Sequence, residues 1–329
     1  MPKAHAPRSG SMQFWPRSRA KRSFARVRFW PQPQGKVQGV RMLGFGAYKA
    51  GMTHVLATDS NKNSPTRGED IRIPVTIMEC PPLRLAGCRF YKSSSRDSKA
   101  MTDLLFKSKK ELARRVNLPK TFAEAADLDK VDRATVDDIV LLVHSQPDLA
   151  RIKKRPEFFE IPLTGSFDEK VAFIKEHASK DLPVSLAFEE GILVDLHGIT
   201  KGKGFQGPVK RFGIGLKKHK SEKGRRAPGS LGGWSGQGHV MYRVAHAGQM
   251  GFFQRTQMNC QILQIGDDPS LVTPKGDFLR YGPVRNMYVM MRGSVPGPSK
   301  RFLVFSHAGR AVGKPQLPTI QIIDRGSKQ

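Results

Sequence analysis

One segment of this chain cannot build a hydrophobic core of its own. Between residues 196 and 266 a single acid, Glu222, stands against twelve lysines and arginines, with glycines and aromatics among them. Such a segment is costly to order in water, because its positive charges repel one another and few apolar side chains offset the lost conformational entropy. A dense polyanion would supply both the countercharge and a surface to pack against. We therefore expect this part of the chain to be built around nucleic acid.

The charge of the whole chain supports this expectation and is unevenly distributed. The chain has 56 Lys+Arg against 28 Asp+Glu, a formal net charge of +28, as nucleic-acid binders commonly do. Residues 103–190 contain 17 acids and 15 bases, whereas all other residues together contain 11 acids and 41 bases. A nearly neutral block, able to fold as an ordinary globule, thus lies within a basic protein. A membrane surface is disfavoured as the partner, because we find neither a basic amphipathic helix nor a lipidation signal.

Other classes of protein are excluded by simpler features. Three cysteines without a CxxC spacing predict a reducing compartment, no disulfide framework and no structural zinc. The longest aliphatic run, residues 139–143, is too short to span a membrane, and the first residues lack the apolar region of a signal peptide. HExxH, GxSxG and P-loop motifs are missing from the sequence. We therefore expect no cofactor, no metal, no catalytic residues and no enzymatic activity.

The pattern of strands and turns predicts four parts. Residues 1–36 form a basic arm with aromatics from Phe14 to Trp30 that could stack on bases. Residues 37–94 and 184–329 have the short strands and frequent turns of an antiparallel β-barrel. Residues 95–183 form an α/β insert, and residues 200–257 form a long basic loop extending from the barrel. The fold class is therefore mainly β with an α/β insert.

Individual elements follow from local signals. In the insert, apolar spacing predicts a helix over 98–117, a capping box at Ser166 predicts one over 167–179, and residues 137–145 read as a buried strand. Outside the insert the strands are expected at 40–58, as two strands joined around 49–51, and at 71–80, 83–91, 184–188, 192–199, 260–266, 278–282, 287–295, 301–305 and 319–324.

The glycines of the basic loop favour contact with a sugar–phosphate surface. Residues 202–207 match GxGxxG, but Pro208, Gly213 and Gly215 argue against the helix that a dinucleotide site needs. Trp234, flanked by glycines, favours a stacking or wedge role over burial, whereas the pair Phe252 and Phe253 could equally pack at the base of the barrel. The dense cationic run from 217 to 226 is expected to be disordered in isolation and to order on RNA.

The candidate RNA-binding residues are mainly the cations of the arm, of the loop and of two strand ends. They are Arg17, Arg19, Lys21, Arg22, Arg26, Arg28, Lys49, Lys201, Lys203, Lys210, Arg211, Lys217, Lys218, His219, Lys220, Lys223, Arg225, Arg226, Trp234, Arg243, Arg255, Lys300 and Arg301.

Five blocks of sequence closely resemble the universal large-subunit ribosomal protein three family, in its archaeal form. They are YKAGMTHV (48–55), ITKGKGFQGPVKRFG (199–213), GSLGGW (229–234), HAGQMGFFQRTQMN (246–259) and GSVPGPSKR (293–301), in the family's order. The resemblance implies a translation-protein-type antiparallel β-barrel with long basic extensions that penetrate rRNA. One departure is Glu222, where eukaryotic relatives have a modifiable histidine before the Lys-Gly that is Lys223-Gly224 here; any role of that histidine is therefore not carried over.

The resemblance also implies a function. It implies a structural constituent of the large ribosomal subunit in the cytoplasm, which binds near the 3′ end of the 23S-type rRNA and nucleates subunit assembly. The loop would reach toward the peptidyl-transferase centre with Trp234 near its tip. The partners would be large-subunit rRNA and neighbouring ribosomal proteins, with no membrane and no homo-oligomer. The alternative is an architectural DNA- or RNA-binding protein outside the ribosome, which would need repeated or dimeric basic modules; no repeat is visible in the sequence.

Overall fold

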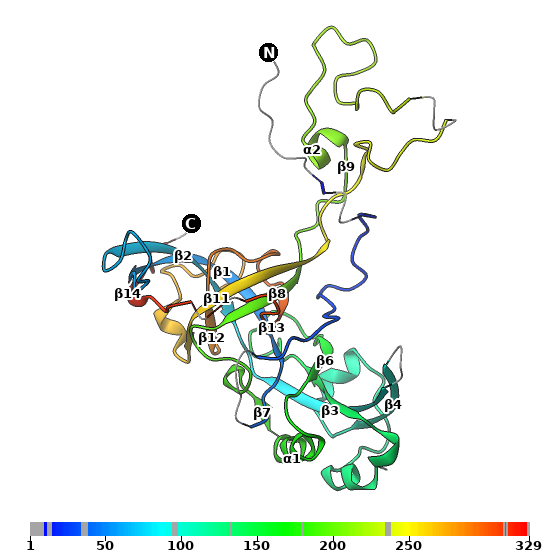
Figure 1. Ribbon diagram of the computed structural model, residues 1–329, viewed down its shortest axis with the longest axis vertical. Helices are drawn as coiled ribbons and strands as arrows, with labels where there is room; N and C mark the ends of the chain where they lie inside the picture. Colours follow the sequence, from blue (N-terminus) through cyan, green and yellow to red (C-terminus); the bar gives the residue numbers. More distant parts are fainter. Residues whose placement is uncertain are drawn as a thin grey trace. The chain divides into compact units, whose positions relative to one another are not determined.

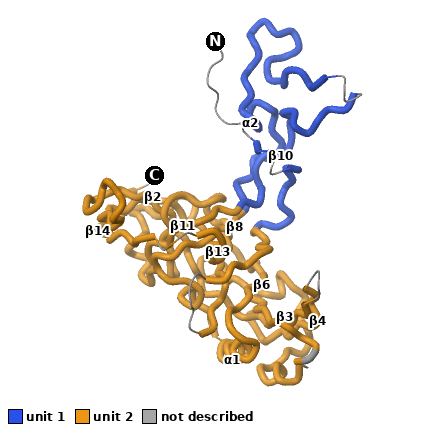
Figure 2. The backbone as a smooth tube through the Cα atoms, in the orientation of Figure 1, with its two compact units in different colours: residues 1–23, 199–255 blue, residues 24–198, 256–329 orange. Residues whose placement is uncertain are grey.

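The chain divides into two compact units. The computed structural model describes residues 10–11, 15–33, 39–93, 98–131, 133–178, 180–233, 238–311, 313 and 315–327. Unit 1 comprises Met1–Ser23 with Ile199–Arg255, and unit 2 comprises Phe24–Gly198 with Thr256–Gln329 (Figure 2). Unit 2 is mainly β, and its described strand pairs are antiparallel (Figure 1). The expected boundaries at residues 36 and 95 lie outside the described residues.

The larger sheet of unit 2 has seven strands. They are β1 (Gly44–Thr58), β2 (Asp70–Glu79), β8 (Leu193–Ile199), β11 (Gln254–Gly266), β12 (Tyr288–Arg292), β13 (Phe302–His307) and β14 (Thr319–Ile323). Their order is β13-β8-β11-β12-β2-β1-β14, and β13 also pairs with β1. The path of hydrogen bonds therefore runs through six strands and returns to its start, while β14 lies on β1 alone. The chain leaves this sheet at the end of β8 and re-enters it in β11.

Strand β1 is continuous where the sequence predicts two strands. Its pairing with β2 shifts register between Lys49 and Gly51, which marks a bulge. A Cβ on Gly51 would lie 2.3 Å from the ring of Phe278. A glycine therefore lets the strand pass this ring without a break, and the turn-like sequence here marks a bulge rather than a loop.

The smaller sheet of unit 2 has five strands, and three of them lie wholly within the nearly neutral block of residues 103–190. Its order is β4 (Ser98–Leu105), β3 (Leu83–Ser93), β5 (Asp138–His144) and β6 (Phe158–Pro162), and β7 (Asp181–Leu182) also pairs with β3. The helix α1 (Phe167–His177) begins at the expected capping box, in which Ser166 and Glu169 cap each other. The predictions for α1 and β5 are confirmed. The sequence, however, predicts strand β3 as part of the barrel, whereas the structure pairs it with β4 and β5 of the insert.

Three other sequence expectations are wrong. Residues 98–117 form β4 and a 3-10 turn, η2 (Lys110–Arg114), instead of a helix. Pairing with β3 over the whole of β4, reinforced by Arg89 binding Asp103 through two 2.6 Å hydrogen bonds, overrides the helix-like apolar spacing. Residues 184–188 contain the 3-10 turn η5 (Val184–Leu186). Residues 278–282 form a turn closed by a bridge between Phe278 and Gly282. The short turns η3 (Ala125–Lys130), η4 (Arg133–Thr135) and η7 (Pro269–Leu271) complete unit 2.

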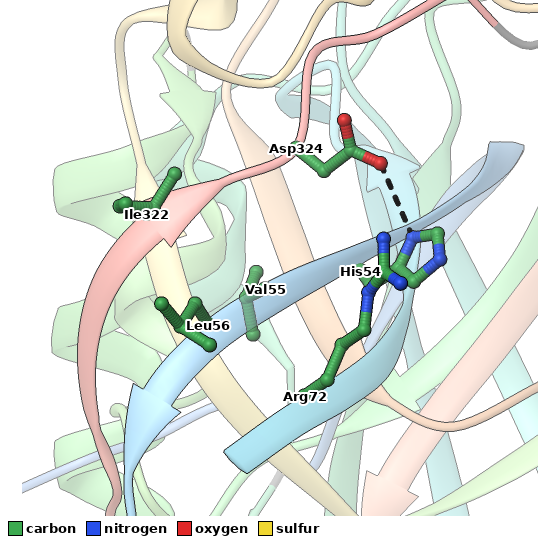
Figure 3. A pocket seen from close by; sticks show the side chains of 6 residues that line it. All are labelled: His54, Val55, Leu56, Arg72, Ile322 and Asp324. Atoms are coloured by element: carbon green, nitrogen blue, oxygen red, sulfur yellow. Dashed lines mark ion pairs between the residues drawn. The ribbon is translucent and has the colours of Figure 1, made fainter. Parts of the chain in front are cut away.

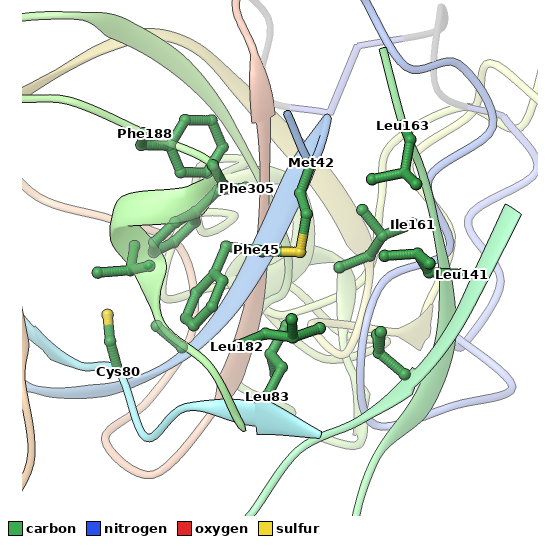
Figure 4. Packing of buried hydrophobic residues seen from close by; sticks show 14 of the residues in the cluster. Met42, Phe45, Cys80, Leu83, Leu141, Ile161, Leu163, Leu182, Phe188 and Phe305 are labelled. Carbon is green, nitrogen blue, oxygen red and sulfur yellow. The ribbon is translucent and has the colours of Figure 1, made fainter. Parts of the chain in front are cut away.

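The two sheets of unit 2 share one hydrophobic core. Phe45 of β1 and Phe305 of β13 lie in the same cluster as Leu141 of β5 and Ile161 of β6, and all four are at most 1% exposed (Figure 4). Burying such side chains stabilises each by about 1.5–3 kcal/mol. Unit 2 therefore has an extensive apolar core of its own. Among the residues that the structure describes, no helix is long and apolar enough to cross a membrane.

Candidate nucleic-acid interface

The long basic loop has an ordered stem. In unit 1, β9 (Phe205–Gln206) pairs antiparallel with β10 (Gly248–Gln249). Lys203 N–H donates to the carbonyl of Met250, and Met250 N–H donates to the carbonyl of Gly204, both at 2.9 Å. Gly251 has φ +72°, and a Cβ there would lie 2.0 Å from the carbonyl oxygen of Lys201. Only glycine allows the two sides of the stem to approach so closely.

A short helix follows β9, contrary to the sequence prediction. The helix α2 (Pro208–Phe212) has Pro208 in its first turn and ends at Gly213, which is left-handed with φ +67°. Proline and glycine are favoured at these two helix ends, so the residues that appeared to exclude a helix delimit it. Because β10 runs antiparallel to β9, the motif is part of a hairpin rather than the βαβ unit that binds a dinucleotide.

Arg211 holds the stem together. It is buried, and its guanidinium donates from Nε to the carbonyl of Gln249 at 3.0 Å and from Nη1 to the carbonyl of His246 at 2.9 Å. Burial lowers the pKa of this guanidinium. It also lies over the rings of Phe212 and Trp15, 5.1 and 5.9 Å from their centroids. The sequence predicts Arg211 as an RNA ligand, whereas in the structure its Nε and Nη1 donate to carbonyls of the protein.

The N-terminal segment packs on the same stem. Trp15 is stacked on Phe212 at 6.2 Å between centroids and meets Tyr242 edge-on at 5.7 Å. The guanidinium of Arg17 lies 4.8 Å from the Phe212 centroid. Ala20 N–H donates to the carbonyl of Phe252 at 2.9 Å. Residues 15–20 of the arm therefore belong to unit 1 and pack against the loop, a relation that the sequence did not reveal.

The aromatic side chains of the arm differ in how far they are buried. Phe24 is only 3% exposed and lies in the core of unit 2, whereas Phe29 is 73% exposed. Trp15 packs in unit 1, and Phe14 lies outside the described residues. Of the aromatics considered for base stacking, Phe29 presents its ring to solvent, and Trp30 is half-buried against the core of unit 2.

Most of the predicted cations of unit 1 are exposed. Unit 1 contains 18 lysines and arginines against one acid, Glu222, over its whole sequence. Its exposed predicted residues are Arg19, Lys21, Arg22, Lys201, Lys203, Lys210, Lys218, His219, Lys220, Lys223, Arg225, Arg226 and Arg243. Lys217 is half-buried, and its N–H donates to the carbonyl of Arg225 at 3.1 Å, which closes the turn between them. The unit thus presents a concentrated positive field to solvent.

Other predicted residues are engaged within the protein or lie outside this cluster. Lys49 is half-buried, with its Nζ donating to the carbonyls of Val295 and Gly297 at 2.8 and 3.1 Å, and burial lowers its pKa. Arg255 lies over Phe253, 5.1 Å from the ring centroid. Arg26, Arg28 and Lys300 are exposed in unit 2, and Arg301 is half-buried there. Trp234 lies outside the described residues.

Comparison with known proteins decides the family. The family model described as Ribosomal protein L3 matches residues 1–329. The chain belongs to the ribosomal protein L3 family. It is 45% identical over 341 residues to the large ribosomal subunit protein uL3 of Methanothermobacter thermautotrophicus, covering 100% of this chain and 99% of that protein. It is 41% identical to the uL3 protein of Methanococcus aeolicus, covering 99% and 98%, and 40% identical to that of Methanocaldococcus jannaschii, covering 96% and 94%.

The family resemblance expected from the sequence blocks is therefore confirmed, with archaeal relatives over the full chain. This member of the L3 family also has a surface pocket of about 360 Å³ between β1, β2 and β14 (Figure 3). Its lining is mainly apolar, with one ion pair in which His54 Nδ1 lies 3.3 Å from Asp324 Oδ2. Within the described residues there is no group of three or more metal-ligating side chains. The cationic surface of unit 1 is the stronger candidate site.

Proposed function

We propose that this protein is a structural constituent of the large ribosomal subunit in the cytoplasm and binds large-subunit rRNA mainly through unit 1. The observation that carries the proposal is the composition of unit 1, 18 bases against one acid, in a member of the ribosomal protein L3 family. Its relatives are described as large ribosomal subunit proteins. This is a family of structural ribosomal proteins rather than of enzymes, so we assign no catalytic role.

The finer assignments extend this proposal. The closed path of strands in unit 2 is the translation-protein-type barrel, and it provides a rigid base for the extensions. Unit 1 binds near the 3′ end of the 23S-type rRNA, and its early binding nucleates subunit assembly. The loop reaches toward the peptidyl-transferase centre, with Trp234 near the tip. Neighbouring large-subunit proteins are the other partners, and the chain acts without a membrane and without a second copy of itself.

Charge neutralisation is the proposed mechanism. Each exposed lysine or arginine that contacts a phosphate releases condensed counterions, so affinity depends steeply on salt. If about ten phosphates are contacted, the affinity falls roughly 10³–10⁵-fold between 50 and 200 mM salt. The predicted residues that remain exposed are assigned to these contacts. Arg211 and Lys49 are assigned instead to holding the stem and the 295–297 loop, because their donors bind backbone carbonyls.

Crosslinking in native cells tests the proposal. The protein is crosslinked to nucleic acid, and the attached molecules are sequenced. Crosslinks concentrated in the 3′ region and the peptidyl-transferase domain of large-subunit rRNA are expected. Crosslinks spread over DNA or over many unrelated RNAs would instead favour an architectural nucleic-acid binder and overturn the proposal.

A further inference from the structure

Phe205 is the most exposed large apolar side chain among the described residues, at 77%. It belongs to β9, where successive side chains alternate between faces. Gln206, the other residue of β9, is half-buried and donates from its side-chain amide to the carbonyl of Lys203 at 2.5 Å. Phe205 therefore stands on the solvent face of a strand whose other face is held by the protein.

The backbone beneath Phe205 is fixed. Phe205 lies opposite Gln249 in the ladder, and the carbonyl of Gln249 accepts the hydrogen bond from Arg211. The hydrogen bond from Met250 N–H to the carbonyl of Gly204 holds the adjacent position. Because the strand is anchored on both sides, the ring has a fixed direction, and the main chain at Phe205 would lose little conformational freedom on binding a ligand.

The surroundings of Phe205 are cationic and open. Lys201, Lys203 and Lys210 are exposed close to it in the sequence. An added Cβ at Gly204 or Gly207 would meet no atom within 4 Å. Exposed lysines thus flank the ring in the sequence, and the main chain beside it is accessible to a flat ligand.

We propose that Phe205 is a stacking platform for an unpaired base of the rRNA, an inference that rests on the function proposed above. Every base presents a π face, so stacking on an aromatic side chain tolerates any sequence. The base must be unpaired and unstacked, because the faces of bases inside an A-form helix are covered by their neighbours. An apolar pocket on another protein is a poorer match, because that protein would also have to neutralise the flanking lysines.

Binding of the full-length protein to deproteinised large-subunit rRNA, measured by filter binding at fixed salt, tests the inference. Phe205→Ala is expected to weaken binding roughly 5- to 150-fold, the loss typical of one stacked base. Phe205→Tyr keeps the ring and should bind within about twofold of wild type, whereas Phe205→Leu keeps only apolar bulk and should be weakened like alanine. Leu279→Ala removes a side chain of unit 2 that is 56% exposed, and serves as the matched control.

Each outcome either supports or overturns the stacking role of Phe205. The salt dependence of Phe205→Ala should match that of wild type, because no phosphate contact is lost. Wild-type affinity in Phe205→Ala, or in Phe205→Leu, would overturn the stacking role while leaving rRNA binding in place. Affinity retained by leucine alone would indicate an apolar contact with the RNA that does not require an aromatic ring. Failure of the wild-type protein to prefer rRNA over DNA would overturn both this inference and the proposed function. If alanine loosens the ladder, shown by faster amide exchange at Met250, the leucine and tyrosine variants decide alone.

Discussion

Arg211 can be replaced by lysine without changing the charge of unit 1. The substitution separates two roles of Arg211, that of a phosphate ligand and that of a structural contact within the stem. Lysine keeps the positive charge that a phosphate ligand needs, but it lacks the planar guanidinium whose several N–H groups bind two carbonyls at once. In the structure the guanidinium joins α2 to the carbonyls of Gln249 and His246, on the opposite side of the loop. We therefore expect Arg211→Lys to loosen the stem of the loop.

The size of the effect follows from the contacts. Hydrogen bonds from a charged donor contribute about 1.5–3 kcal/mol each. Lysine can retain one of the two bonds, so one is lost. The planar contact with Trp15 and Phe212, at 5.9 and 5.1 Å, adds about 0.5–2 kcal/mol. The stem should therefore open more easily by about 2–5 kcal/mol, which corresponds to roughly 30- to 5000-fold faster exchange of its amide hydrogens, up to complete loss of protection.

Hydrogen exchange measured on the full-length free protein is the suitable assay. The amides of Lys203 and Met250 report on the stem, because both donate to carbonyls across it at 2.9 Å. Peptides from β1 and β2 in unit 2 provide an internal reference. Lys210→Ala changes an exposed side chain of the same helix and should leave exchange in the stem unchanged, as a surface substitution does.

Unchanged protection at Lys203 and Met250 in Arg211→Lys would refute the structural assignment. Arg211 would then return to the set of phosphate ligands, and its contribution should be sought in RNA binding. Faster exchange in the Lys210→Ala control to the same degree would also refute it, because the stem would then be sensitive to any change on α2.

Three further predictions concern charge and burial. Lys203→Ala should weaken rRNA binding uniformly across sequences and reduce the slope of log K against log salt by about 1. Glu79 is fully buried and accepts hydrogen bonds from Tyr281 and from two backbone N–H groups. Glu79→Gln should therefore lower the free energy of unfolding, measured in urea, by about 1–3 kcal/mol. Glu189→Gln, the control at an exposed ion pair, should lower it by less than about 1 kcal/mol. Burial and the nearby Arg41 lower the pKa of His307 from 6.5 to about 4. Folding favours the neutral imidazole, so His307 contributes about 3 kcal/mol at most to the free energy of unfolding above pH 6.5, and this contribution is lost as the pH falls toward 4. His307→Gln should therefore flatten the plot of this free energy, measured in urea, against pH between 6.5 and 4. An unchanged plot would contradict this.

The sequence predicts those elements whose signals are local. The helix α1 begins at a capping box that Ser166 and Glu169 complete within four residues. Strand β5 is a run of apolar residues that are buried on both faces. Strand β4 has no such local signature, because its pairing with β3 depends on residues such as Arg89 that lie outside it. Its apolar spacing fits a helix, and only the tertiary pairing decides against one.

In the candidate site, too, the sequence predicts what depends on local signals and misses what depends on tertiary contacts. Each block that resembles the L3 family is a continuous run of residues, and the five blocks in order predict the family, as the full-length match confirms. The sequence also locates the positive field, because charge is visible in composition. It does not separate exposed cations from structural ones. Lys49 donates to Val295, 246 residues away, and Arg211 donates to Gln249, 38 residues away. Partners at such distances are determined by the fold and not by neighbouring residues.

The division of charge also implies a gradient of order within unit 1. The stem is held by Arg211, by the ladder and by Trp15 stacked on Phe212. Beyond it, residues 214–233 contain six lysines and arginines between 217 and 226, and the apolar side chains Leu216 and Leu231 are 52% and 48% exposed. That part has little buried apolar surface to offset mutual repulsion, so its free energy of local opening should be low. Added salt should therefore favour order there in the free protein, because it screens the repulsion, while it weakens binding to RNA. In the proposed complex, RNA would replace salt as the countercharge.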